Sequence, residues 1–222
     1  MNTIARKLIA KDFYLYRWLI VGATLAGLVG LVIAAEGKVR FNIGMLTWLT
    51  TLVAFGVVLV MLAIGSERKE RQLQFVLSLP LSHGDYTRIR VVGLLLCFLV
   101  PWAVLSVGAV ALVAVMPNLP DGLMPFVVLL SGFFLANYSV VLSSSLHTKS
   151  EGVMTFVIIV TNMGITLFIF LIGALPSLND HLQDATPVWN PTFWYVLGAE
   201  AAVLVITLSL PYFIAARRRD FI

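Results

Sequence analysis

Six long apolar runs, separated by shorter polar segments, dominate the chain. Each run holds about the 18–20 apolar residues that a helix needs to cross roughly 30 Å of hydrocarbon. The pattern predicts an all-α membrane protein with a single transmembrane domain over residues 1–222. The expected spans are residues 18–35, 43–65, 91–116, 123–146, 153–175 and 192–216.

The basic residues mark alternate polar segments. Cytoplasmic segments of membrane proteins hold an excess of Lys and Arg. Thirteen of the 15 Lys and Arg residues fall in four stretches that six crossings would place on one side, whereas Lys38 and Arg40 fall on the other. We therefore expect both termini to be cytoplasmic. The four stretches contain Arg6, Lys7, Lys11 and Arg17; Arg68, Lys69, Arg71, Arg88 and Arg90; Lys149; and Arg217, Arg218 and Arg219.

Composition agrees with a membrane protein. Of the 222 residues 60% are hydrophobic, and the mean hydropathy is +0.98. The longest polar segments are too short to form a domain with its own core, so any catalytic domain is expected on another chain. The formal net charge is +4, but the basic residues lie beside span ends, where anionic lipid headgroups attract them. Membrane lipids are therefore expected partners and nucleic acid is not.

Residues 3–17 place apolar and basic side chains at helical spacings before the first span. One interpretation is an interfacial helix that leads into the membrane. The other is a basic flank that only orients the span. The first apolar run begins at about Trp18, is long enough to cross and lacks an A-x-A cleavage pattern after it, so it is expected to remain in the mature protein.

The segment between the second and third runs has an unusual composition. It begins with charges, continues with apolar residues and reaches Pro80, which cannot continue a helix. A second short helical segment is expected to open at Ser82 or Asp85. The first segment predicts a short, apolar cytoplasmic helix that needs a protein groove or the inner leaflet to cover it.

Three polar residues inside the runs are candidates for a pathway or a dimer interface: Asn137, Asn162 and Glu200. Small and hydroxylated residues around Asn137 are also typical of tight helix packing. An amide such as that of Asn162 needs a partner within the membrane. For Glu200 three interpretations stay open: a functional or dimer-interface role, a hydrogen-bonded structural carboxyl, or a side chain that reaches the outer surface.

Several kinds of chemistry lack their usual residues. The sequence has no G-x-x-x-x-G-K-[ST] phosphate loop, so any ATP and Mg²⁺ are expected in a partner chain and no cofactor in this one. The three histidines, His83, His147 and His181, fall in separate loops and do not predict a metal site. No histidine falls within a run to serve a buried nucleophile. A membrane-embedded enzyme is therefore only the third interpretation.

The segment after the second run resembles ABC-2-type transporter permeases. In that family an acidic–basic start leads through an apolar helix to a Leu-Pro-x-Ser sequence, which matches Glu67-Arg68, Leu73 and the sequence Leu79-Pro80-Leu81-Ser82. The six-span layout, the basic N-terminal segment and the Arg-Arg-Arg-Asp-Phe tail are also similar. Two departures concern the subfamily: Gln72-Leu73 replaces a common Gly-Thr pair, and Arg88 and Arg90 replace a lysine.

The resemblance implies a permease subunit that dimerises, and the partners it implies are a second permease copy and a separate ABC ATPase. It also implies a coupling helix that contacts the ATPase between spans 2 and 3. The residues carried over to that helix are Glu67, Arg68, Glu70, Arg71, Phe75, Leu77, Leu79 and Pro80.

We accordingly expect the transmembrane subunit of an ATP-driven exporter in a bacterial inner membrane. The spans hold few fixed charges, which favours an amphipathic or hydrophobic substrate such as an antibiotic, peptide or lipid-like molecule. The main alternative is a non-transporting membrane protein that anchors or regulates an ATPase.

Overall fold

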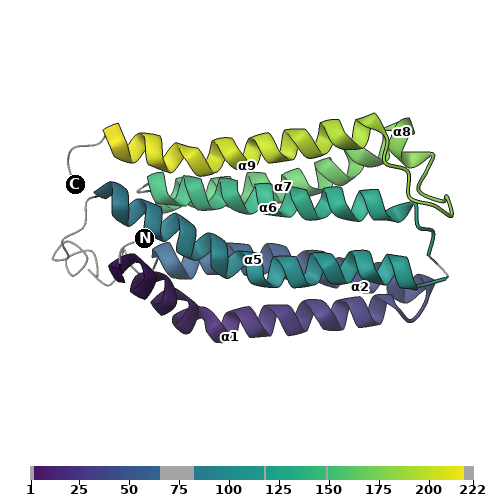
Figure 1. Cartoon of the computed structure of the whole chain (residues 1–222), viewed down its shortest axis with the longest axis horizontal. Helices are drawn as coiled ribbons and strands as arrows, with labels where there is room; N and C mark the ends of the chain where they lie inside the picture. Colours follow the sequence, from purple (N-terminus) through teal and green to yellow (C-terminus); the bar gives the residue numbers. More distant parts are fainter. Residues whose placement is uncertain (1–2, 66–82, 118, 149, 218–222) are drawn as a thin grey trace.

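The computed structural model describes residues 3–65, 83–117, 119–148 and 150–217 (Figure 1). Helices account for nearly all of this part of the chain, and no strand occurs in it. The helices, labelled as in Figure 1, are α1 (Thr3–Ala34), α2 (Lys38–Val60), the π-helical turn η1 (Met61–Gly65), α5 (His83–Val115), α6 (Leu123–His147), α7 (Glu151–Gly173), α8 (Pro176–Asn179) and α9 (Pro191–Arg217).

Six of these helices are long and apolar enough to cross a membrane, which confirms the predicted all-α, six-span fold. The candidate spans are Ala5–Ala34, Arg40–Ile64, Gly84–Val115, Leu123–His147, Glu151–Gly173 and Pro191–Ile214. The fourth, fifth and sixth agree with the expected ranges to within about two residues. The first and third begin earlier than expected, because their helices continue from the membrane into flanking polar sequence.

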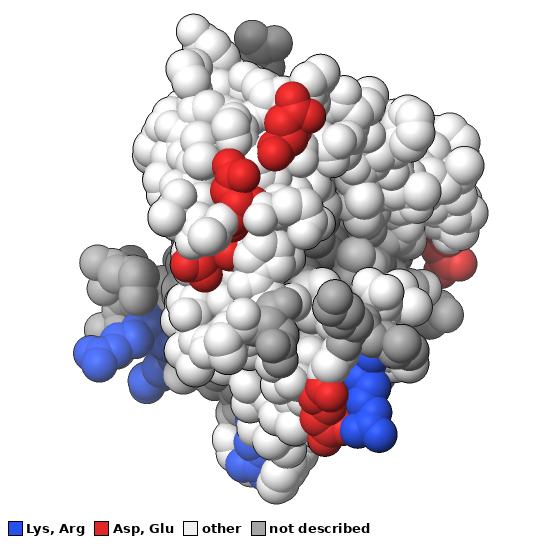
Figure 2. Space-filling model, turned by 90° about the vertical axis from the view of Figure 1, so that its right-hand side faces the viewer, with Lys and Arg blue, Asp and Glu red and all other residues white. Residues whose placement is uncertain are grey.

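The two ends of the bundle differ in charge. Both ends of the described chain lie at the same end of the bundle, where η1 finishes and α5 begins (Figure 1). The opposite end carries acidic residues in its connections, at Glu36, Asp121, Asp180 and Asp184, and Figure 2 shows acidic groups dispersed over that end. Because Lys and Arg set the orientation and acidic residues contribute little, the cytoplasmic side of the termini stays a prediction from the basic stretches.

Helix α6 is the most enclosed of the six spans. In its most apolar window 61% of residues are buried, against 11% in the corresponding windows of α7 and α9. Aromatic rings pack tightly beside it: the ring of Tyr138 stacks on Phe98 of α5 with centroids 3.9 Å apart, and Phe98 stacks on Phe55 of α2 at 5.9 Å. The Tyr138 hydroxyl also donates to the Leu94 carbonyl at 2.9 Å. Helix α6 is thus the shared wall against which α2, α5, α7 and α9 pack.

Helices α1 and α2 form a close hairpin. Gly37 occupies its turn at φ +138°, a conformation that L side chains rarely adopt. Farther along, a Cβ added at Gly44 would meet the backbone of Gly30 and Ala34. Glycine therefore permits a backbone contact between these two spans, as small residues commonly do in membranes.

Residues 3–17 are helical, and they continue without interruption into the first span as α1 (Figure 1). Figure 1 shows a bend between the first turns of α1 and the remainder. One face of these turns is buried, at Ala5, Ile9, Asp12 and Tyr16, whereas Leu15 is 60% exposed. The N-terminal segment therefore packs one face on the bundle and leaves its basic face outside.

Candidate functional site

A groove runs between α5, α6 and α9, with a cavity volume of about 540 Å³. Its walls are almost wholly apolar. Three side chains with polar groups, Ser106, Ser131 and Glu200, interrupt the apolar lining, together with the indole of Trp102. The other lining residues are Val107, Val110, Ala111, Val128, Gly132, Leu135, Leu197, Ala201 and Leu204.

The groove exists because α5 and α9 converge at one end only. At the end that carries the termini, the Arg88 guanidinium lies 5.8 Å from the Tyr212 ring centroid, which joins α5 to α9. From there α5 runs diagonally away from α9 (Figure 1). Pro101 lies within α5, where proline removes a helical hydrogen bond and favours a bend. The divergence opens the space that the apolar side chains line.

Two interhelical hydrogen bonds fix the walls. The Trp102 indole N–H donates to the Ser131 carbonyl at 2.8 Å and joins α5 to α6. The hydroxyls of Ser139 and Thr207 lie 2.6 Å apart and join α6 to α9. The first bond lies in the wall of the groove, and the second lies farther toward the termini, so α6 is tied to both neighbours.

The carboxyl of Glu200 is the most unusual group in the groove. The residue is 7% exposed, and neither carboxyl oxygen accepts a hydrogen bond from a described residue. A Cβ added at Gly132 of α6 would meet the Glu200 Oε2 atom. The glycine therefore leaves the room that the carboxyl occupies between α9 and α6.

Ser106 lies at a similar depth on α5. It is 8% exposed, and its hydroxyl likewise has no hydrogen-bond partner among the described residues. Ser106 lies nine residues before the end of α5, and Glu200 lies nine residues after the start of α9. Nine residues of helix span about 14 Å at 1.5 Å per residue, so both lie at about the same distance from that end of the bundle. Buried polar groups are rarely left unpaired. Two of them in one apolar groove make this groove the candidate site.

This geometry narrows the interpretations of Glu200. A structural carboxyl would accept hydrogen bonds from neighbouring helices, and one that reached the surface would be exposed. The structure has neither feature. These observations favour a pathway or an interface for an unpaired carboxyl beside an open groove, and that role stays a prediction.

The two asparagines are not part of this groove. Asn137 lines a small crevice of about 20 Å³ with residues of α2 and α5, including Phe98. Asn162 of α7 donates to the Ile158 carbonyl at 2.7 Å in its own helix, and its buried amide oxygen has no partner among the described residues. The three polar residues that the sequence singles out therefore lie in separate environments.

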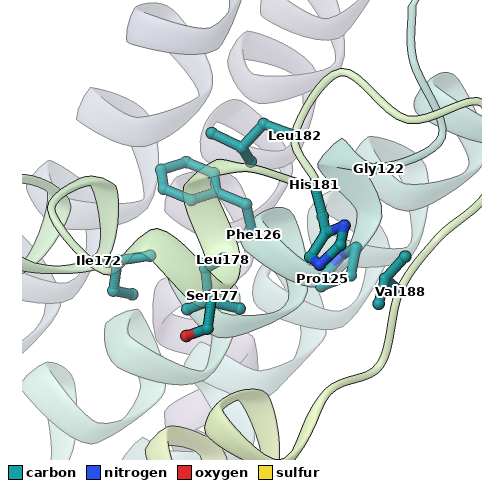
Figure 3. Close-up of a pocket in the computed structure, with 9 residues that line it drawn as sticks. All are labelled: Gly122, Pro125, Phe126, Ile172, Ser177, Leu178, His181, Leu182 and Val188. Atoms are coloured by element: carbon teal, nitrogen blue, oxygen red, sulfur yellow. The ribbon is translucent and has the colours of Figure 1, made fainter.

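Two other hollows are less suited to a polar ligand. A groove of about 590 Å³ lies between α1 and α2, but Thr47 and Thr51 in it donate to carbonyls of their own helix. The other hollow, of only about 10 Å³, lies where the segment between α7 and α9 packs against α6 (Figure 3). Such a volume holds about one water molecule.

The small hollow in Figure 3 nevertheless shows how this end of the bundle closes. Leu178 of α8 is 7% exposed and packs with Leu129, Ile172 and Phe193. The Gly122 N–H donates to the Asp184 carbonyl at 3.0 Å, and His181 Nδ1 lies 2.7 Å from Asp184 Oδ2. The segment between α7 and α9 thus folds back over the start of α6.

The residues assigned to the coupling helix, Glu67 to Pro80, lie outside the described residues. Their flanks are described. Arg90, expected in a cytoplasmic basic stretch, is 6% exposed and pairs with the equally buried Asp12 of α1. Its Nη2 atom also donates to the Ala63 carbonyl in η1 at 2.6 Å. The ion pair therefore joins α1 to α5 and the hydrogen bond joins α5 to η1, close to the flanks of residues 66–82.

Sequence reasoning missed this pair and did not single out Ser106. The lone acidic residue in the basic N-terminal stretch, Asp12, was a signal for the first. Ser106 is a single hydroxyl in an apolar run and gave none. No cluster of three or more metal-ligating side chains occurs in the described part of the chain.

Comparison with known proteins does not assign the chain to a family. No protein-family model matches it, and no curated protein matches it significantly. What the described helices establish by themselves is a multi-pass, all-α membrane protein with six candidate spans.

Proposed function

We propose that this chain is the transmembrane permease subunit of an ATP-driven ABC exporter, located in a bacterial inner membrane. It acts as a homodimer with a separate ATPase subunit that binds ATP and Mg²⁺. The substrate is an amphipathic or hydrophobic molecule. The coupling segment between η1 and α5 transmits the motion of the ATPase to the bundle.

The observation that carries the proposal is the groove between α5, α6 and α9 with the unpaired carboxyl of Glu200. An open apolar groove with few polar groups is the usual form of a small-molecule site. A protein that only anchors an ATPase has no need of a buried, unpaired carboxyl, which is costly in a membrane.

The architecture supports coupling to a cytoplasmic partner. The ends of the coupling segment, at Gly65 and His83, lie at the same end of the bundle as both termini (Figure 1). The Asp12–Arg90 pair and the Ala63 carbonyl join these flanks to α1. A displacement of the segment would therefore act on three helices together.

The test is reconstitution with the cognate ATPase in lipid vesicles. The proposal predicts ATP-dependent movement of an amphipathic substrate and ATP hydrolysis that the substrate stimulates. ATP hydrolysis without transport and without stimulation by any tested substrate would favour the anchoring alternative. A neighbouring reading frame that encodes a P-loop ATPase identifies the partner to use.

A further inference from the structure

We propose that the groove between α5, α6 and α9 binds a hydrophobic cation, with Glu200 as its counter-ion. This inference names the substrate class of the proposed exporter and rests on that function for the transport role. The binding site itself can be tested without the ATPase.

The charge of the groove argues for a cation. Within the described part of the chain, no Lys or Arg lines the groove, so the Glu200 carboxylate has no internal counter-charge. An ionised carboxylate is costly when it is buried without a partner. A bound cation would supply the missing charge and contact the carboxyl directly.

The remaining lining suits the apolar part of such a ligand. Leu135, Leu197 and Leu204 provide aliphatic walls, and the Trp102 indole adds an aromatic ring of the kind that attracts cations. The Ser106 hydroxyl lies across the groove from α9 as an additional hydrogen-bonding group. The site therefore combines one negative charge with a large apolar surface.

Access to the groove is lateral. Val107 on its rim is 69% exposed, and Ala201 is also exposed. Both lie within helices that span the membrane. A ligand that partitions into the bilayer can therefore reach the groove from the side, which is the behaviour of a hydrophobic cation and not of a small hydrated one.

A second copy of the chain is a poorer occupant. In a two-fold interface the same surface meets itself, so that two copies of this face would bring together two Glu200 carboxyls. No described basic residue lies at the depth of Glu200: Arg40 lies at the start of α2, and Arg88 and Arg90 lie near the start of α5, toward the termini. Such an interface would leave the carboxyls without a counter-charge.

The experiment measures binding of radiolabelled tetraphenylphosphonium to the full chain in phosphatidylcholine nanodiscs, with empty nanodiscs subtracted. Tetraphenylborate, of nearly the same shape and opposite charge, serves as the paired probe. We expect saturable binding of the phosphonium and none of the borate. Glu200→Gln should bind the phosphonium at least about tenfold more weakly, because the buried charge pair is lost.

Two further variants separate charge from folding. Glu151→Gln removes an exposed carboxylate at the start of α7 and should leave binding unchanged. Ala201→Phe keeps Glu200 but fills the groove, and should abolish binding. Retention of the size-exclusion profile and of the melting temperature shows that each variant is folded.

Equal binding by the wild type and Glu200→Gln, or no saturable binding, would overturn the site. Cross-linking of Val107→Cys between copies, together with no phosphonium binding, would assign the groove to a dimer interface instead. Glu200-dependent binding by a chain that supports no ATP-driven transport would leave the site intact and overturn the exporter. Transport of other substrates without phosphonium binding would leave the exporter function intact and overturn the cation site.

Discussion

Arg90 holds both carboxylate oxygens of Asp12 from a single terminal nitrogen, at 2.8 and 2.9 Å, although 78 residues separate the two in sequence. Both residues are almost fully buried. The second terminal nitrogen of Arg90 donates to the Ala63 carbonyl of η1. A basic residue that sequence position assigns to a surface stretch thus fixes three helices to one another.

Asp12→Asn should destabilise the bundle by about 3–5 kcal/mol, because removal of one partner leaves the buried Arg90 charge uncompensated. The measurement is reversible unfolding in detergent micelles. Asp180→Asn, on the exposed segment after α8, is the control and should change stability by less than about 0.5 kcal/mol. A double variant with Arg90→Gln should lose less than the sum of the single variants. Additive losses would show that the pair does not interact energetically.

Gly44→Ala should lower stability by about 1–3 kcal/mol, because the new Cβ would meet the backbone of Gly30 and Ala34. Gly22→Ala is the matched control, since a Cβ there has nothing within 4 Å. It should leave stability unchanged or raise it by up to about 1 kcal/mol through helix propensity. Thermal unfolding of both variants compares them directly, and a stable Gly44→Ala protein would refute the close contact of α1 and α2.

Gly132→Ala should weaken phosphonium binding by at least about tenfold, because the added Cβ displaces the Glu200 carboxyl from its place beside α6. Gly164→Ala on α7, where a Cβ meets nothing within 4 Å, should bind as the wild type does. Equilibrium dialysis provides the comparison. An unchanged affinity in Gly132→Ala would mean that the position of the carboxyl does not matter to the ligand.

Cysteine labelling in intact cells tests the orientation. Cys97 is buried and should not react, and its replacement by alanine gives a background without thiols. A membrane-impermeant maleimide should then label Asn179→Cys in intact cells, because α8 lies at the acidic end of the bundle. It should label Ala10→Cys, on the exposed side of α1, only after permeabilisation. The opposite pattern would invert the assigned topology.

The six spans could be predicted from sequence because their length and hydropathy are local properties of the chain. Packing between spans could not, since apolar residues face both lipid and protein in a membrane. Thus Leu129 is fully buried whereas Phe170 is 70% exposed, and both lie in apolar runs. Helix ends were predicted less well where charged residues continue a helix, as in α1.

Only the part of the candidate site that is visible in one apolar run could be predicted from sequence. Glu200 is noticeable in sequence because an acidic residue is rare in an apolar run. Ser106 and Gly132, which line the same groove, belong to other helices. The three residues meet only through the packing of α5, α6 and α9, which sequence does not reveal. The coupling role of residues 67–80 stays a prediction from the family resemblance.

The most direct test of the proposed function is affinity purification of the tagged chain from its native membrane, followed by identification of bound proteins and an ATP hydrolysis assay. The account predicts that a P-loop ATPase co-purifies and hydrolyses ATP. It also predicts that replacing Phe75, Leu77 and Leu79 by Glu abolishes this association while the bundle stays folded. Purification without any ATPase, or an association that survives the triple replacement, would contradict the assigned coupling.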